Sequence, residues 1–153
     1  MIKRKVYLVL DNIRSAQNVG SIFRTADAVG VVKIYLCGIT PKPPRKDIDK
    51  SALGAVDFVE WEYVESARQK AESLKQEGVG IIALEQDKRS LPYAQLATSD
   101  KPLALVVGSE IDGVSSEILD IADKIIEIPM NGQKNSLNVS VATGIALYKI
   151  IEN

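Results

Sequence analysis

The chain has 153 residues, of which 46% are hydrophobic and 25% are charged, with a net charge of −1, and this length suits one well-buried domain. It contains no histidine and one cysteine, which excludes Ser-His-Asp and Cys-His nucleophilic sites, nearly all zinc sites and an intramolecular disulfide. Because the chain lacks a membrane-spanning apolar run and the charged start MIKRK is no signal peptide, we expect a cytoplasmic protein that needs neither a membrane nor a metal.

Apolar runs and helical patterns alternate in the first half of the chain. The β-branched run Val6–Leu10 predicts a buried strand, and residues 14–30 predict a helix that ends at Gly30. A second strand is expected over residues 32–37, which makes Cys37 a buried core residue. A basic loop and a short turn over residues 51–55 then lead to a short strand with the sequence FVEW.

The second half continues the alternation. A charged surface helix is expected to end at Gly78, and residues 79–84, 103–108 and 124–129 predict three more buried strands. A short helix with Ser115 as its cap separates the last two strands. Strands that are apolar on both faces and alternate with helices indicate a mostly parallel sheet covered on both sides, and therefore one α/β domain.

The last helix has an unusual beginning. Its helical pattern is predicted to start at Ser136, and its apolar residues recur at spacings of three and four: Leu137, Val141, Ile145 and Tyr148. Gly144 leaves room for close packing. Polar residues in its first turns, Ser136, Asn138 and Ser140, add little to a plain amphipathic helix. They either face a ligand, or Ser136 caps the helix while the other two are solvated.

Three polar, glycine-containing stretches follow the ends of predicted strands. They cover residues 11–24, 108–115 and 129–140. Ligands of parallel sheets collect beyond the carboxyl ends of the strands, so these stretches are expected to meet at one site. The first stretch lacks the G-x-G-x-x-G pattern, which argues against an ordinary dinucleotide cofactor.

These stretches carry a resemblance to a known family. The patterns N-x-G-x-x-x-R-T-A (residues 18–26), L-x-x-G-S-E (105–110) and I-P-M-x-G-x-x-x-S-L-N-V-S-x-A (128–142) resemble the three motifs of the SpoU, or TrmH-like, RNA ribose 2′-O-methyltransferases of the SPOUT superfamily. The resemblance implies a C-terminal trefoil knot, an S-adenosylmethionine site and a homodimer with catalytic groups from both subunits. It covers nearly the whole of residues 1–153, and no appended RNA-binding domain is expected.

The resemblance also implies roles for individual residues. The catalytic positions that it implies are Arg24, Asn18, Glu110, Ser136 and Asn138. The cofactor-binding positions that it implies are Leu84, Gly108, Ile128, Met130, Ser136 and Leu137.

Arg24 is the central catalytic residue by resemblance. Since a guanidinium is essentially never deprotonated in proteins, we expect it to hold a phosphate and stabilise the developing alkoxide rather than act as a base. Asn18, Glu110, Ser136 and Asn138 match positions that orient Arg24 and the ribose. Two departures from the family pattern, Ser109 and Ile111, predict a locally different second-motif loop, because isoleucine resists positive φ.

The expected partner is structured RNA, most readily tRNA and otherwise rRNA. The charge balance gives no global attraction to RNA, so binding must be local, for example at Lys3 to Lys5 or at the basic loop over residues 40–50. The apolar residues Ile145, Leu147, Ile150 and Ile151 of the last helix cover more than one face, which favours a dimer. The alternative is a non-catalytic knotted RNA-binding module, which would be free to lose Arg24 and the SLNVS segment.

Overall fold

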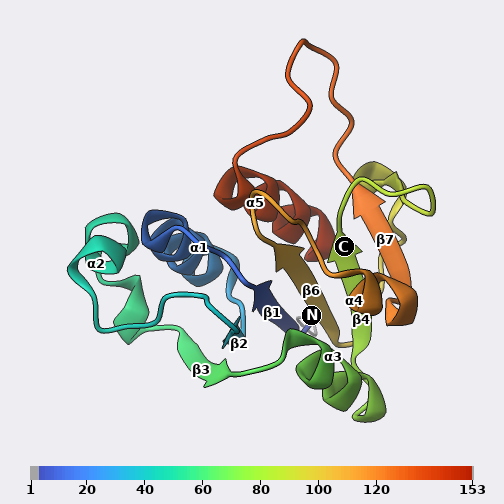
Figure 1. Ribbon diagram of the computed structural model, residues 1–153. Coiled ribbons are helices and arrows are strands. Elements are labelled where there is room, and N and C mark those ends of the chain that lie inside the picture. Colours follow the sequence, from blue (N-terminus) through green and yellow to red (C-terminus); the bar gives the residue numbers. More distant parts are fainter. Residues whose placement is uncertain (1–3, 153) are drawn as a thin grey trace.

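The computed structural model describes residues 4–152, which form a seven-stranded sheet with helices on both faces (Figure 1). All strand pairs are parallel, and the spatial order of the strands is β3-β2-β1-β6-β4-β7-β5. The predicted single α/β domain with a parallel sheet is confirmed. The strands are β1 (Val6–Asp11), β2 (Lys33–Cys37), β3 (Glu60–Val64), β4 (Gly80–Leu84), β5 (Leu91–Pro92), β6 (Leu103–Gly108) and β7 (Lys124–Glu127).

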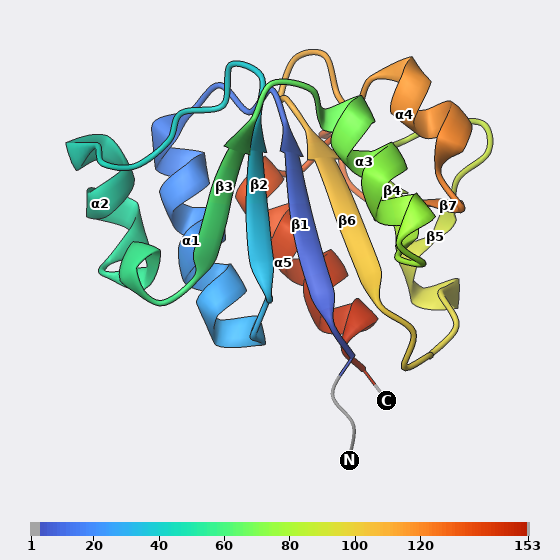
Figure 2. The same ribbon diagram turned by 90° about the horizontal axis from the view of Figure 1, so that it is seen from below.

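The helices divide between the two faces of the sheet (Figure 2). On one face lie α1 (Ala16–Val29), α2 (Lys46–Ala52) and α5 (Val139–Ile150), and on the other lie α3 (Ala67–Gln76) and α4 (Ser116–Ile121). Two short 3-10 turns, η1 (Ala55–Asp57) and η2 (Tyr93–Gln95), complete the chain. Each face therefore has its own apolar core, and the strands contribute alternate side chains to both.

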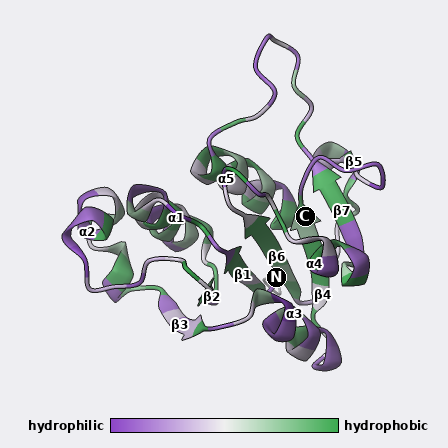
Figure 3. Ribbon diagram, in the orientation of Figure 1, coloured by the Kyte–Doolittle hydropathy of each residue, from purple (hydrophilic) through white to green (hydrophobic). Residues whose placement is uncertain are grey.

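Hydropathy follows this layering (Figure 3). The central strand β6 is buried at every position, whereas the edge strand β3 is exposed or half-buried along its whole length. The apolar core on the α1 side includes Phe23, Ile34 and Leu105, all fully buried. Cys37 is also fully buried, as expected, and burial raises the pKa of its thiol to about 12.

The strand β6 comes late in the sequence but lies at the centre of the sheet. It pairs with β1 on one side, where Val6 lies opposite Leu103, and with β4 on the other. The carboxyl ends of β1, β4, β6 and β7 consequently lie at one edge. The three predicted ligand-binding stretches begin at this edge.

Several sequence-based boundaries were wrong. The basic loop and turn contain the helix α2, whose first turn carries Asp47 and Asp49 and is therefore favoured by the helix dipole. The strand β3 begins two residues later than the predicted FVEW segment, and the two-residue strand β5 was not predicted. Ser115 does occupy the N-cap of α4, but its side chain makes no capping hydrogen bond.

The last helix also differs from its predicted form. It begins at Val139, because Asn138 and not Ser136 is the N-cap: the Asn138 side chain accepts hydrogen bonds from Ser140 N and Val141 N. The predicted apolar series is not its buried face, since Leu137, Val141 and Tyr148 are exposed. The buried residues of α5 are Thr143, Ala146, Leu147 and Ile150.

Candidate active site

A cavity of about 680 Å³ lies at the carboxyl ends of β4, β6 and β7. The loops after these three strands and the first turn of α5 form its walls. All six predicted cofactor-binding residues line it: Leu84, Gly108, Ile128, Met130, Ser136 and Leu137. Residues that lie far apart in the sequence therefore meet at the position that parallel sheets use for ligands.

The second-motif loop is held tightly at one wall of the cavity. Gly113 N donates to Ser109 O over 2.9 Å, and Asp112 N donates to the Ser109 hydroxyl over 2.8 Å. A Cβ added at Gly108 would lie 2.1 Å from the carbonyl carbon of Gly113, so only glycine fits there. The left-handed residue of the loop is Gly113, with φ of +68°, and Ile111 keeps a negative φ.

Two carboxylates fix this loop to neighbouring strands. Glu85 Oε1 accepts from Val114 N over 2.7 Å and packs directly against Gly113. Asp11 is 6% exposed and accepts from Ser115 N over 3.1 Å. Burial raises the pKa of Asp11, and the bond from Ser115 opposes this shift. The loop is thus anchored to the ends of both β4 and β1.

A chain of hydrogen bonds joins the three motifs at the mouth of the cavity. Asn18 Nδ2 donates to Glu110 Oε1 over 3.2 Å, and Asn138 Nδ2 donates to Asn18 Oδ1 over 3.2 Å. Ser15 caps α1 by accepting from Asn18 N, which fixes the start of that helix beside the loop. The predicted residues Asn18, Glu110 and Asn138 are therefore brought together.

The polar side chains of the SLNVS segment (residues 136–140) could either face a ligand or serve as a cap and solvated surface. Ser136 and Asn138 line the cavity and therefore face a potential ligand, as the first interpretation expected. Asn138 also caps α5, which neither interpretation assigned to it. Ser140 lines a different groove, between α1 and α5.

The cavity lining is acidic, which the sequence analysis missed. Five carboxylates line it, and no lysine or arginine of the described residues does so. The carboxylates are Glu85, Asp87, Glu110, Asp112 and Glu127. Their position directly after or at the ends of β4, β6 and β7 was the available sequence signal, since those ends form the ligand-binding edge.

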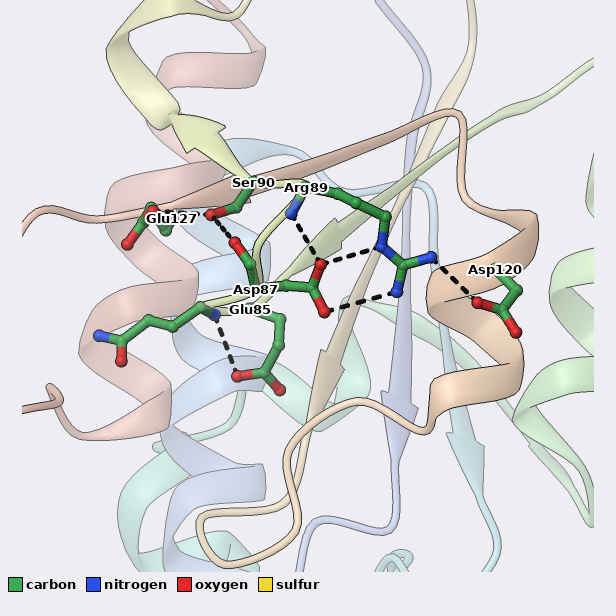
Figure 4. A network of polar contacts seen from close by, with 7 residues as sticks. Glu85, Asp87, Arg89, Ser90, Asp120 and Glu127 are labelled. Carbon is green, nitrogen blue, oxygen red and sulfur yellow. Dashed lines mark hydrogen bonds and ion pairs between the residues drawn. The ribbon is translucent and has the colours of Figure 1, made fainter.

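Ion pairs fix the loop after β4, as Figure 4 shows. The Arg89 guanidinium lies between two carboxylates: Nε is 2.9 Å from Asp87 Oδ1, and Nη1 is 3.0 Å from Asp120 Oδ1 on α4. The bond from Arg89 lowers the pKa of Asp87. Ser90 Oγ donates to Glu127 Oε1 over 2.7 Å, which ties the same loop to β7.

Arg24 lies outside this cavity. Its side chain is exposed on α1 and takes part in no hydrogen bond or ion pair within residues 4–152. The next residue, Thr25, lines a shallow groove with Val141, Gly144 and Tyr148 of α5. A Cβ at Gly144 would lie 3.4 Å from Thr25 Cγ2, which is an ordinary van der Waals separation, so a role of this glycine in close packing stays a prediction.

The two candidate RNA-binding patches are partly engaged in contacts within the chain. Lys3 lies outside the described residues, and Arg4 donates to the backbone oxygens of Lys101 and Ile150. In the basic loop, Arg45 is paired with Asp47 at 2.7 Å and Lys42 lies over the Tyr63 ring. No helix within residues 4–152 has the length and apolarity that crossing a bilayer requires.

Comparison with known proteins decides the family. The model of the SpoU rRNA methylase family matches residues 5–148, which includes all three motifs and every residue of the cavity. The chain belongs to the SpoU methylase family. The predicted family membership is therefore confirmed.

Relatives of the SpoU family are similar in both sequence and structure. A tRNA (guanosine(18)-2′-O)-methyltransferase of Aquifex aeolicus is 41% identical over 149 residues, which are 96% of this chain and 70% of that protein. The 23S rRNA (guanosine-2′-O-)-methyltransferase RlmB of Vibrio parahaemolyticus is 33% identical over 144 residues, but this chain spans only 58% of its length.

Two solved structures agree with the fold. The AdoMet-bound rRNA methyltransferase of Sinorhizobium meliloti superimposes with a TM-score of 0.90 at 30% identity, over 96% of this chain and 56% of that one. The TrmH/SpoU tRNA modifying enzyme of A. aeolicus superimposes with a TM-score of 0.85 at 38% identity, over 97% and 76% respectively. The SpoU-family relatives thus include an enzyme with bound S-adenosylmethionine.

Proposed function

We propose that this chain transfers a methyl group from S-adenosylmethionine to a ribose 2′-hydroxyl in structured RNA, with tRNA as the first candidate substrate and rRNA as the second. One observation carries the proposal: the cavity that holds the six cofactor positions opens beside the hydrogen-bonded chain Asn18, Glu110 and Asn138. The cofactor site and the groups that could orient a ribose are therefore adjacent.

The cavity suits this cofactor. Leu84, Ile128 and Leu137 supply apolar walls for an adenine, and Gly108 allows the second-motif loop to close tightly beside them. S-adenosylmethionine supplies an electrophilic methyl group on a positively charged sulfonium. Five carboxylates without a lining lysine or arginine favour such a cation and disfavour the polyphosphates of NAD or ATP.

The residues of this chain have separate tasks in the proposed transfer. Glu110 and Asn138, linked through Asn18, accept and donate hydrogen bonds that hold the ribose hydroxyls in one orientation. The Arg24 guanidinium binds an RNA phosphate and stabilises negative charge as the 2′-hydroxyl loses its proton to phosphate or water. Ser136 lines the same cavity and belongs to both the predicted catalytic and the predicted cofactor-binding positions.

A homodimer is part of the proposal, because Arg24 does not reach the cavity of its own chain. The groove formed by Thr25, Val141, Gly144, Ile145 and Tyr148 is apolar and adjoins Arg24. Val141 and Tyr148 are 50% and 54% exposed, so a second copy could cover them. Leu147 and Ile150, which the sequence analysis used as support, are instead buried in the core of the chain itself.

We also propose the trefoil knot that the resemblance implies. Its support is the contact between the two segments concerned: Gln86 Nε2, after β4, donates to Asn135 O, after β7, over 2.7 Å. The segment after β7 then leads into α5, which packs against α1 and β6.

The cofactor and the reaction can be tested separately. Calorimetry with S-adenosylmethionine, NAD and ATP should show binding of the first and no comparable binding of the other two. Mass spectrometry of nucleosides from tRNA and rRNA incubated with enzyme and cofactor should show a new 2′-O-methyl nucleoside. Cofactor and RNA binding without any methyl transfer would instead favour the non-catalytic RNA-binding module.

The dimer has its own test. Sedimentation at micromolar concentration should give a dimer, and Tyr148→Asp should convert it to monomer, since a buried charge is costly in an apolar interface. A wild-type chain that sediments only as a monomer would contradict the proposed assembly.

A further inference from the structure

The side chain of Ile111 is an apolar group at the mouth of the cavity. It lies between Glu110 and Asp112 on the second-motif loop, lines the cavity and is 73% exposed. Both neighbours in the sequence are acids, so the exposed isoleucine is not part of an apolar patch of this loop. An apolar side chain held in water at a binding site gains free energy only when a ligand covers it.

The loop presents Ile111 rigidly. The bonds from Gly113 N and Asp112 N to Ser109 close the turn on both sides of it, and Glu85 holds the following residue Val114. Since these contacts surround Ile111 in sequence, they fix the backbone from which its exposed side chain projects. The fold therefore positions this apolar group before any ligand arrives, which lowers the entropy cost of a contact.

Ile111 is neither one of the six predicted cofactor positions nor part of the proposed dimer surface. The apolar walls at the cofactor positions come from Leu84, at the end of β4, and from Ile128 and Leu137, which follow β7. The groove between α1 and α5 does not include Ile111. What does adjoin Ile111 is Glu110, the acceptor of the hydrogen bond from Asn18 at the mouth of the cavity.

We propose that Ile111 packs against the nucleobase of the nucleotide whose ribose is methylated, and so acts as a specificity-determining residue. This inference rests on the proposed function. A nucleobase is bonded directly to its ribose, so a ribose held at Glu110 brings its base within reach of the next residue in the loop. A base offers an apolar face, and enzymes that read unstacked bases commonly hold them against apolar or aromatic side chains.

The first test compares two isoleucines. Ile111→Ser removes the proposed contact, and Ile39→Ser removes a side chain of the same type, 62% exposed, that does not line the cavity. With unmodified tRNA transcripts, Ile111→Ser should raise the RNA dissociation constant or KM by roughly 5- to 30-fold, as expected for one lost apolar contact. Ile39→Ser should change it by less than about twofold.

Two further measurements show whether the cofactor or a partner subunit, rather than a nucleobase, contacts Ile111. S-adenosylmethionine affinity and the sedimentation coefficient should be unchanged in Ile111→Ser. A weaker cofactor affinity would assign Ile111 to the cofactor, loss of the dimer would assign it to the partner subunit, and either result overturns the proposal. So does unchanged RNA binding and turnover.

A second test isolates the base itself. Once methylation by the wild-type enzyme has identified the target nucleotide, the same RNA is made with an abasic ribose at that position. Loss of the base should weaken RNA binding to the wild-type enzyme but not to Ile111→Ser, because the abasic site and the substitution remove the same contact. Full additivity would overturn the inference. If wild type methylates no RNA, the proposed function fails, while the direct binding comparison of the two serine variants still decides the contact.

Discussion

The cofactor cavity and the helix surface that carries Arg24 are built in different ways. Around the cavity, hydrogen bonds and ion pairs join the loops after β4, β6 and β7, and Gly108 and Gly113 fit with no space for a side chain. Arg24 is exposed, and no group within residues 4–152 holds its guanidinium. Under the proposed function, a single copy of the chain would therefore complete the cofactor half of the site and leave the catalytic half incomplete.

The proposed function therefore assigns cofactor binding and catalysis to different parts of the molecule. Under the proposed function, the preorganised groups around the cavity hold the cofactor without RNA, whereas the Arg24 guanidinium gains a partner only from an RNA phosphate or a second copy of the chain. Substitutions in the two halves should therefore affect different measurements. The following changes test that division, beginning with the largest expected effect.

Arg24→Ala should reduce methyl transfer by about 100- to 1,000-fold, the usual loss for one electrostatic stabiliser of a transition state. Cofactor affinity and the dimer should be nearly unchanged. Arg24→Lys should not restore activity, since an ammonium lacks the planar fork that binds a phosphate at two points. Single-turnover methylation of unmodified tRNA with parallel cofactor titration measures both effects. Full activity of Arg24→Ala would remove Arg24 from the mechanism.

Gly108→Ala should affect the half of the site that is proposed to bind the cofactor. The new Cβ would lie 2.1 Å from backbone atoms of Gly113, so the second-motif loop must shift. We expect cofactor affinity to fall about tenfold or more, in line with a cost of about 1–3 kcal/mol for overpacking. Gly132→Ala is the matched control, because no atom lies within 4 Å of its added Cβ. Equal cofactor affinities for the two variants in calorimetry would show that the loop is not rigid.

Asn138→Ala should affect both halves, because this residue caps α5 and also bonds to Asn18. We expect a loss of about 0.5–2 kcal/mol in the free energy of unfolding, with weaker cofactor binding and slower turnover. Ser66→Ala removes the cap of α3 and is the control. It should lower stability similarly in urea titrations but leave cofactor binding intact. If Ser66→Ala weakened cofactor binding as much as Asn138→Ala, the loss of binding would follow from lower stability and not from the position of Asn138 at the cavity.

Arg89→Ala should have the smallest effect. It releases Asp87 from its ion pair, so we expect cofactor affinity to fall a few-fold while the urea midpoint shifts less than for Asn138→Ala. Arg68→Ala, which removes ion pairs to Glu72 and Glu117 elsewhere on the surface, should leave cofactor affinity unchanged. Equal cofactor affinities in these two variants would show that the ion pair between Arg89 and Asp87 does not contribute to cofactor binding.

The same ion pair predicts a pH dependence. Because Arg89 lowers the pKa of Asp87 in the folded state, the stabilisation is present above the ordinary aspartate value of about 4. It is lost as the pH falls through the lowered pKa. The difference in urea midpoint between wild type and Arg89→Ala should therefore be constant at neutral pH and vanish in strong acid. A difference that persisted below the lowered pKa would contradict this assignment.

The sequence predicted the parts of this protein that depend on local pattern. Alternating apolar runs were enough for the parallel α/β fold, and motif residues such as Gly108 and Met130 do line one cavity. The order of the strands could not be predicted, because local pattern contains no information on which strand pairs with which. The start of α5 was misplaced since Ser136 and Asn138 are both good caps, and tertiary contact with Asn18 favours the second. The acidic lining was missed because Glu85 and Asp87 resemble ordinary loop residues.

The central position of β6 has a consequence for the order of folding. The backbone N–H and C=O groups along one edge of β1 have no partner strand from the time β1 is synthesised until Leu103 and its neighbours leave the ribosome. Pairing across such a separation is slow, because a long loop must close before any contact forms. The β1-β2-β3 unit should therefore collapse first, as a partial sheet with an open edge at β1. During that interval a chaperone that shields this edge would increase the yield of native protein, and a truncated chain that ends before β6 should aggregate.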